Sequence, residues 1–108
     1  MAQRLNRGDV PLCIFEPTDK ERAVLILTRD SALGHLTRVT VAPISSTVRG
    51  VPSEVILDIG DGMKGQCAVN LHNVVTLSQQ RIGKRVASLG VQRMQEVCRA
   101  LGFALGCG

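Results

Sequence analysis

Apolar residues along this 108-residue chain gather in short runs first and recur with a helical period only near its end. The run from Ala23 to Leu27 is continuous, which is typical of a strand buried on both faces, and it predicts a strand over residues 22–28. Comparable runs predict further strands over residues 9–15, 38–44, 53–59, 67–71 and 74–77. Polar or glycine-containing turns separate them, and we expect residues 38–44 and 53–59 to pair as a long hairpin.

The end of the chain predicts an amphipathic helix, because its apolar residues recur at helical spacing: Val91, Met94, Val97, Cys98, Leu101, Ala104 and Leu105. Many short strands followed by one helix indicate a mainly β protein of the α+β class, in which the helix covers an open face of a small bent barrel. The length suits one domain over residues 1–108 with one core.

The formal charge of +4 and pI near 9.2 favour a polyanionic partner without identifying one. Residues 1–61 hold seven basic and eight acidic side chains, whereas residues 62–108 hold six basic and one acidic, so the basic excess lies in the second half. Arg81, Lys84 and Arg85 are close enough to attract phosphates together, although a merely solvated basic face is as common. The apolar runs are too short to span a membrane and no secretory signal is evident, so we expect a cytoplasmic protein.

Several kinds of chemistry find little support. The four cysteines form no close pair, which favours free thiols over a disulfide or zinc site, and Cys98 is expected in the core. No phosphate-binding glycine loop or HExxH helix is present. His35 and His72 remain an alternative as a general acid and base pair. Glu54 and Asp58 share a strand face, but exposed acids there usually only keep a surface soluble.

What remains is an ordered set of segments spread over nearly the whole chain. It begins with Arg7-Gly8-Asp9-Val10, Glu21-Arg22-Ala23-Val24-Leu25-Ile26-Leu27 and Val41-Ala42-Pro43-Ile44-Ser45-Ser46-Thr47-Val48-Arg49-Gly50. It continues with Pro52-Ser53-Glu54-Val55, Lys64-Gly65-Gln66-Cys67-Ala68-Val69, Thr76-Leu77 and Arg81-Ile82-Gly83. Together these segments resemble the MazF/PemK family of type II toxin–antitoxin endoribonucleases.

This resemblance implies a Src-homology-3-like barrel of the CcdB/MazF type, usually a homodimer, that cuts single-stranded RNA at a short sequence without a metal or cofactor. The ribose 2′-hydroxyl would attack the adjacent phosphate, and the family's arginine and hydroxyl residue correspond to Arg22 and Ser45. Both could donate hydrogen bonds to the negative charge that develops on the phosphate. The competing interpretations are an ion pair of Arg22 with Glu21 or Asp19 and a turn in which Ser45 bonds its own backbone. The family also implies a cognate MazE-like antitoxin with an acidic tail.

The chain departs from the family at several places. Ala23 stands where proline is usual, the loop over residues 16–20 is short, and Pro11 and Leu12 replace aromatic residues of the first strand. With only two phenylalanines and no other aromatic side chain, base stacking is barely available. We therefore expect RNA to be held by backbone groups and by Ser46, Thr47, Arg49, Arg81 and Lys84.

Two other functions remain open at this point. One is a gyrase poison of the CcdB kind on the same barrel, which would bind a protein and cut nothing. The other is a nucleic-acid-binding or protein-binding barrel without catalysis, which the missing aromatic residues suggest.

Overall fold

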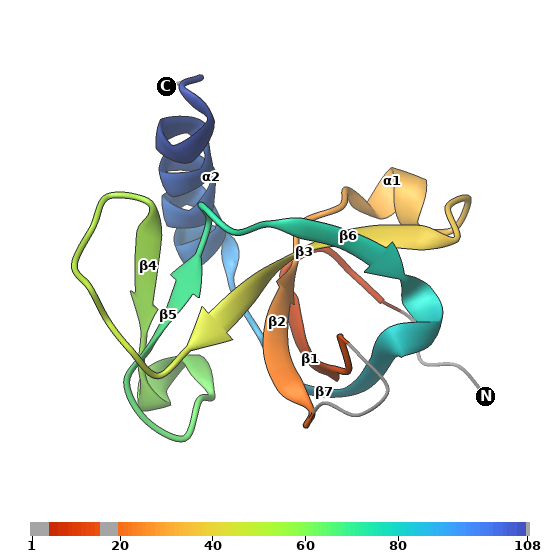
Figure 1. Ribbon diagram of the computed structural model, residues 1–108, viewed down its shortest axis with the longest axis horizontal. Coiled ribbons are helices and arrows are strands. Elements are labelled where there is room, and N and C mark those ends of the chain that lie inside the picture. Colours follow the sequence, from red (N-terminus) through yellow and green to blue (C-terminus); the bar gives the residue numbers. More distant parts are fainter. Residues whose placement is uncertain (1–4, 16–19, 108) are drawn as a thin grey trace.

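Seven antiparallel strands and a C-terminal helix form the framework of the protein, as the computed structural model shows for residues 5–15 and 20–107 (Figure 1). The elements in chain order are β1 (Asp9–Cys13), β2 (Arg22–Ile26), α1 (Asp30–Leu33), β3 (Arg38–Ser45), β4 (Glu54–Leu57), the 3₁₀ turn η1 (Ile59–Asp61), β5 (Cys67–Asn70), β6 (Val75–Ser78), the 3₁₀ turn η2 (Gln79–Arg81), β7 (Ile82–Ser88) and α2 (Val91–Leu105). The expected mainly β class with a final helix is confirmed. Most of the expected turn at residues 16–21 lies outside the described residues.

The sheet follows the order β4-β5-β3-β2-β1-β7, with β6 paired to the first half of β3. The hairpin expected between β3 and β4 is therefore wrong, because β5 lies between them. All four residues of β5 are buried, so this short strand takes the inner position and the more exposed β4 takes the edge. Strand β3 leaves β2 after Pro43 and pairs with β5 from Ile44 onward.

Strand β2 is buried on both faces, which explains its uninterrupted apolar sequence. Leu25 belongs to the larger core cluster, which lies between the sheet and α2. Val24 and Ile26 point the other way, into a smaller cluster that Leu77 of β6 and Leu33 of α1 help to close. The sheet thus bends around two small cores, one on each face, and the bend gives the barrel-like shape of Figure 1.

Helix α2 stands against the β4 and β5 end of the sheet (Figure 1). It buries a narrow stripe formed by Met94, Val97 and Ala100, and it ends at Leu105, before Gly106, whose φ of 72° is the left-handed conformation common after helices. The expected core position of Cys98 is wrong. Cys98 lies one residue beyond the buried stripe, and its exposed sulfur accepts a hydrogen bond from the Arg7 guanidinium at 3.2 Å.

Strand β7 and the short helix α1 were not expected from the sequence. Most side chains of β7 are exposed or half-buried, and the charged pair Lys84 and Arg85 hides its strand character. Such charges are common on edge strands, where they discourage pairing with another chain. No helix in the described part of the chain is long and apolar enough to cross a membrane.

Candidate functional site

Arg22 and Ser45 lie at the same end of the paired strands β2 and β3. The last recorded pair of these strands joins Val24 to Pro43, and Arg22 and Ser45 are each two residues further along. Arg22, at the start of β2, is exposed and lies opposite Cys13 of β1. Its guanidinium makes no hydrogen bond or ion pair with any residue that the structure describes, Glu21 included. The expected alternative partner Asp19 lies outside those residues.

Ser45 is half-buried at the end of β3, opposite Ala68 of β5. Its hydroxyl oxygen accepts a hydrogen bond from the backbone N–H of Thr47 at 3.0 Å, which is the local turn bond weighed as an alternative to catalysis. The bond uses one lone pair of the oxygen and leaves the hydroxyl proton free to donate. The turn therefore orients Ser45 without consuming its capacity as a donor.

A groove of about 730 Å³ opens at this end of the strands, lined by Ser45 and by Ala23, the residue after Arg22. Its apolar floor includes Leu12 of β1, Ala23 of β2 and Val86 of β7, and Ser45 lies at its margin. The opposite wall is the end of the connection between β4 and β5, residues 62–66, together with Cys67 at the start of β5. Gly62 has a φ of 92°, and a side chain there would bring a Cβ within 3.2 Å of the Ala87 Cβ, so glycine lets this connection approach β7 closely.

The wall of the groove contains residues that the sequence analysis did not select. Lys64 and Gln66 are exposed there, and neither side chain has a hydrogen-bond partner among the described residues. An exposed lysine in the glycine-containing turn Gly62-Met63-Lys64-Gly65, just before a buried strand, is a signal that could have indicated Lys64. Cys67 also lines the groove, but burial, with Asp61 and Asp58 nearby, raises the pKa of its thiol. Cys67 is therefore a neutral thiol at ordinary pH rather than a nucleophile.

The loop after Ser45 carries three of the expected RNA-binding residues, Ser46, Thr47 and Arg49, and all three are exposed. The loop is held by Glu54 at the start of β4. One carboxylate oxygen of Glu54 accepts the backbone N–H of Gly50 at 2.8 Å and that of Arg49 at 3.0 Å. The expectation that Glu54 only keeps the surface soluble is therefore wrong.

The other acid on this segment, Asp58, also has a structural role rather than a purely solvating one. Strand β4 ends at Leu57, so Asp58 lies beyond the strand and accepts the Gly60 backbone N–H at 2.9 Å as the cap of η1. Asp61 of η1 then binds Arg93 of α2 at 2.9 Å, and this bond holds the pKa of the Asp61 carboxyl below its usual range. The pair fixes the start of the groove wall against the helix.

In the basic patch expected around Arg81, two of the three side chains already have partners within the protein. The Arg81 guanidinium donates to the carbonyl of Phe15 at 2.9 Å and reaches that of Ile14 at 3.5 Å. Arg85 lies 3.6 Å from the buried carboxylate of Asp9. Lys84 is exposed on β7.

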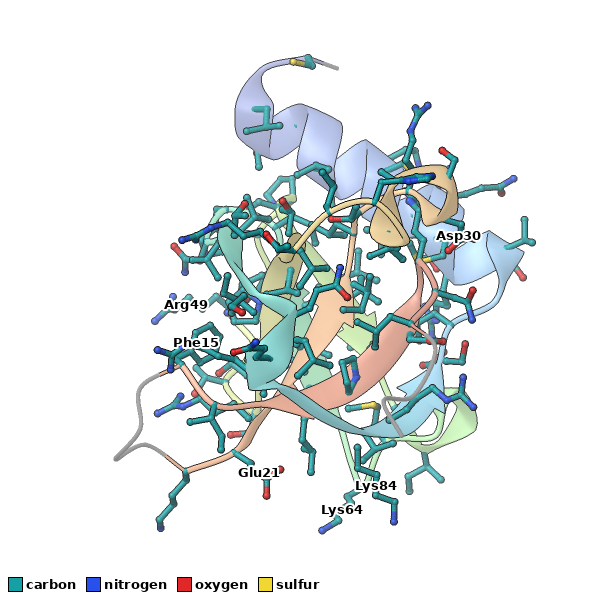
Figure 2. The ribbon with its side chains drawn as sticks, turned by 90° about the vertical axis from the view of Figure 1, so that its right-hand side faces the viewer. Phe15, Glu21, Asp30, Arg49, Lys64 and Lys84 are labelled. Atoms are coloured by element: carbon teal, nitrogen blue, oxygen red, sulfur yellow. The ribbon has the colours of Figure 1, made fainter. Side chains whose placement is uncertain are left out.

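The expected RNA-binding residues divide between two regions of the molecule. The connection between β3 and β4, which carries Arg49, lies far from the connection between β6 and β7, which carries Arg81 (Figure 1). Lys84 instead projects from the same lower side as Lys64 in Figure 2. Of these cations, Lys64 lines the groove, and the Arg49 loop continues from Ser45.

The two histidines follow different elements of the fold. His35 follows α1, whereas His72 follows β5 and its Nδ1 lies 2.7 Å from the Ser53 hydroxyl. No hydrogen bond joins the two rings within residues 5–15 and 20–107, and neither histidine lines the groove.

Solved MazF toxins share this bent antiparallel sheet with its C-terminal helix. The solved structure of the Mycobacterium tuberculosis toxin MazF-mt6 matches it with a TM-score of 0.85 and 34% identity, covering 93% of this chain and 98% of that one. The model of the PemK-like, MazF-like toxin of type II toxin–antitoxin systems matches residues 6–105. The chain belongs to this family.

Two further relatives extend this comparison. The chain is 38% identical over 102 residues to the probable endoribonuclease MazF5 of Mycobacterium tuberculosis, covering 94% of this chain and 93% of the relative. A solved endoribonuclease from mycobacterial species, in complex with its cognate antitoxin, has a TM-score of 0.85 and 25% identity, with coverage of 96% and 97%.

Proposed function

We propose that this toxin is an endoribonuclease that cuts single-stranded RNA at a short sequence through attack by the ribose 2′-hydroxyl, without a metal ion. The observation that carries the proposal is the position of Arg22 and Ser45 at one end of the β2–β3 pair, where Ser45 lines the open groove and both residues have donors available. Family membership and the endoribonuclease relatives support the same activity.

The chemistry needs little from the protein beyond well-placed donors. A bond forms between the 2′-oxygen and phosphorus, and the bond from phosphorus to the 5′-oxygen breaks. A proton leaves the 2′-oxygen and one returns to the 5′-oxygen, so the products carry a 2′,3′-cyclic phosphate and a 5′-hydroxyl. Negative charge builds on the other phosphate oxygens, where the forked guanidinium of Arg22 and the hydroxyl of Ser45 would donate hydrogen bonds.

RNA would lie along the groove with its phosphates near Lys64 and Lys84, and its bases would meet the loop that carries Thr47 and Arg49. Aromatic stacking contributes little in this proposal. Phe15 packs against the smaller core cluster, and Phe103 lies on α2, away from the groove floor. Recognition would rest on hydrogen bonds and on stacking against the arginine plane.

The test is cleavage of a long defined RNA in EDTA, with both product ends identified. We expect Arg22→Ala and Ser45→Ala each to cut about 100-fold or more slowly while remaining folded, the scale for losing one donor to a transition state. Ser45→Thr keeps the hydroxyl and should stay active, and DNA should resist because it has no 2′-hydroxyl. Full activity in Arg22→Ala together with its loss in His72→Ala would transfer catalysis to the histidine, and 5′-phosphate ends would exclude the mechanism.

We also propose that the active form is a cytoplasmic homodimer that a cognate MazE-like antitoxin neutralises by occluding the RNA groove. The complex of the mycobacterial relative with its antitoxin supports a partner of this kind. An acidic tail that folds on binding can cover a long basic groove. Antitoxin and RNA should therefore compete, and both should bind more weakly as salt increases. A ternary complex with undiminished RNA affinity would exclude occlusion.

A further inference from the structure

The loop after Ser45 depends on side chains rather than on main-chain pairing for its shape. Residues 47–50 lie outside every strand and helix, and none of them makes a backbone–backbone hydrogen bond among the described residues. Side-chain oxygens take that place. Ser45 accepts the N–H of Thr47 at one end, and Glu54 accepts those of Arg49 and Gly50 at the other.

Glu54 is well placed for this role. It is half-buried at the start of β4, opposite Asn70 of β5, so the ladder fixes its backbone. Its own N–H donates to the carbonyl of Val51 at 3.0 Å, which closes the turn between the loop and the strand. The carboxylate therefore reaches back from a rigid strand to a loop that has little regular structure.

The two N–H groups that Glu54 binds belong to consecutive residues and converge on one oxygen. Gly50 adopts a φ of 74°, and a left-handed residue in such a position turns neighbouring N–H groups toward a common point that suits an anion. Hydrogen bonds from N–H groups to a charged carboxylate are roughly twice as strong as neutral ones. The Glu54 carboxylate thus occupies an anion site made by the loop itself, and it selects one conformation of residues 47–50.

We propose that Glu54 is a positioning residue, which holds the loop so that Thr47 and Arg49 face RNA next to Ser45. This inference rests on the proposed function, because it needs RNA to be the ligand of the loop. For RNA affinity, this positioning role predicts the opposite of what charge alone predicts. Removing a carboxylate from a protein that binds RNA should strengthen binding, whereas loss of the loop conformation should weaken it.

Three variants of the full chain separate these effects. Glu54→Ala removes the acceptor. Glu54→Gln removes the charge but keeps an oxygen that can accept both N–H groups. Glu96→Ala removes one negative charge from α2, where Glu96 binds Arg93 at 3.1 Å and makes no hydrogen bond or ion pair with the loop among the described residues. Thermal unfolding of each variant sets a temperature at which all are folded.

The first measurement is limited trypsin digestion. Mass spectrometry monitors the rate of the initial cut at the Arg49–Gly50 bond. Opening of the loop should speed this cut about tenfold in Glu54→Ala, since a hydrogen bond to a charged group contributes at least the 1.4 kcal/mol that corresponds to that factor. Glu54→Gln and Glu96→Ala should be cut within about threefold of the wild-type rate. An unchanged rate in Glu54→Ala would overturn the proposal.

The second measurement uses RNA. Binding is measured with RNA made unreactive by a 2′-deoxy substitution at the cleavage site. For Glu54→Ala we expect the Kd for this RNA and the KM for cleavable RNA each to rise about tenfold, whereas kcat should change less than about threefold. Glu54→Gln should restore both constants, and Glu96→Ala should bind as well as the wild type or better. Equal losses in the alanine and glutamine variants, or a loss confined to kcat, would overturn the positioning role. If the wild-type protein cut no RNA, the proposed function would fail. Faster digestion and weaker RNA binding by Glu54→Ala would still support the role of Glu54 in binding.

Discussion

Arg81 provides a sharp test, because the sequence predicts an RNA contact and the structure shows a structural one. Its guanidinium donates to the carbonyl of Phe15 at 2.9 Å, and its own carbonyl accepts the N–H of Ile14 at 3.2 Å. Arg81 therefore ties the end of β1 to η2. The Arg81 charge also lies near Cys13 at the end of β1, because it opposes the rise that burial causes in the pKa of the Cys13 thiol.

The size of the effect follows from these contacts. Replacing Arg81 with alanine leaves the half-buried Phe15 carbonyl without its donor, and a hydrogen bond that involves a charged group contributes about 1.5–3 kcal/mol. For a domain of this length, 1 kcal/mol shifts Tm by roughly 4–8 °C. We therefore expect Arg81→Ala to unfold roughly 6–24 °C below the wild type, with Arg81→Lys between the two because it keeps one donor and the charge.

The assay combines thermal unfolding followed by circular dichroism with RNA binding measured well below every Tm. Lys84→Ala is the matched control, since Lys84 is exposed on the neighbouring strand. It should leave Tm unchanged and reduce the slope of log affinity against log salt by about 1. The reasoning is refuted if Arg81→Ala has the same Tm as the wild type and loses as much RNA affinity as Lys84→Ala, since Arg81 would then be a phosphate contact.

Three further predictions concern the groove wall and the core. Because the Asp61 carboxyl has a pKa lowered first by its hydrogen bond from Arg93, the pair stabilises the fold above about pH 4, near the usual value for aspartate, and this contribution is lost as pH falls further. The difference in unfolding free energy between wild type and Asp61→Asn should therefore be constant near neutral pH and shrink in acid, and a pH-independent difference would contradict the assignment. Lys64→Ala should weaken RNA binding most at low salt and leave Tm unchanged; equal affinity across a salt titration would remove Lys64 from the RNA path. Val97→Ala, at a fully buried position of α2, should lower the urea unfolding free energy by about 1–3 kcal/mol, and a change below 0.5 kcal/mol would show that the helix does not close the core.

The sequence by itself determined the elements in which the burial of side chains follows a regular pattern along the chain. Strand β2 was predicted to within two residues of its end and helix α2 over its observed length, because a strand buried on both faces and a helix with one buried stripe leave clear periodicities. Arg22 and Ser45 were also selected from sequence, through a family resemblance that the comparisons confirm. Their catalytic roles remain predictions.

Tertiary structure decided what depends on neighbours distant in the chain. Pairing of β3 with β5 instead of β4 could not be predicted, since alternation along a strand indicates which face is buried but not which strand lies beside it. The functions of charged residues were equally hidden. Arg81, Glu54 and Lys64 all look like surface charges in sequence, yet one binds the end of β1, one holds a loop and one lines the groove. A charged side chain takes its role from whichever partners the fold brings within hydrogen-bond distance, and only the folded chain defines those partners.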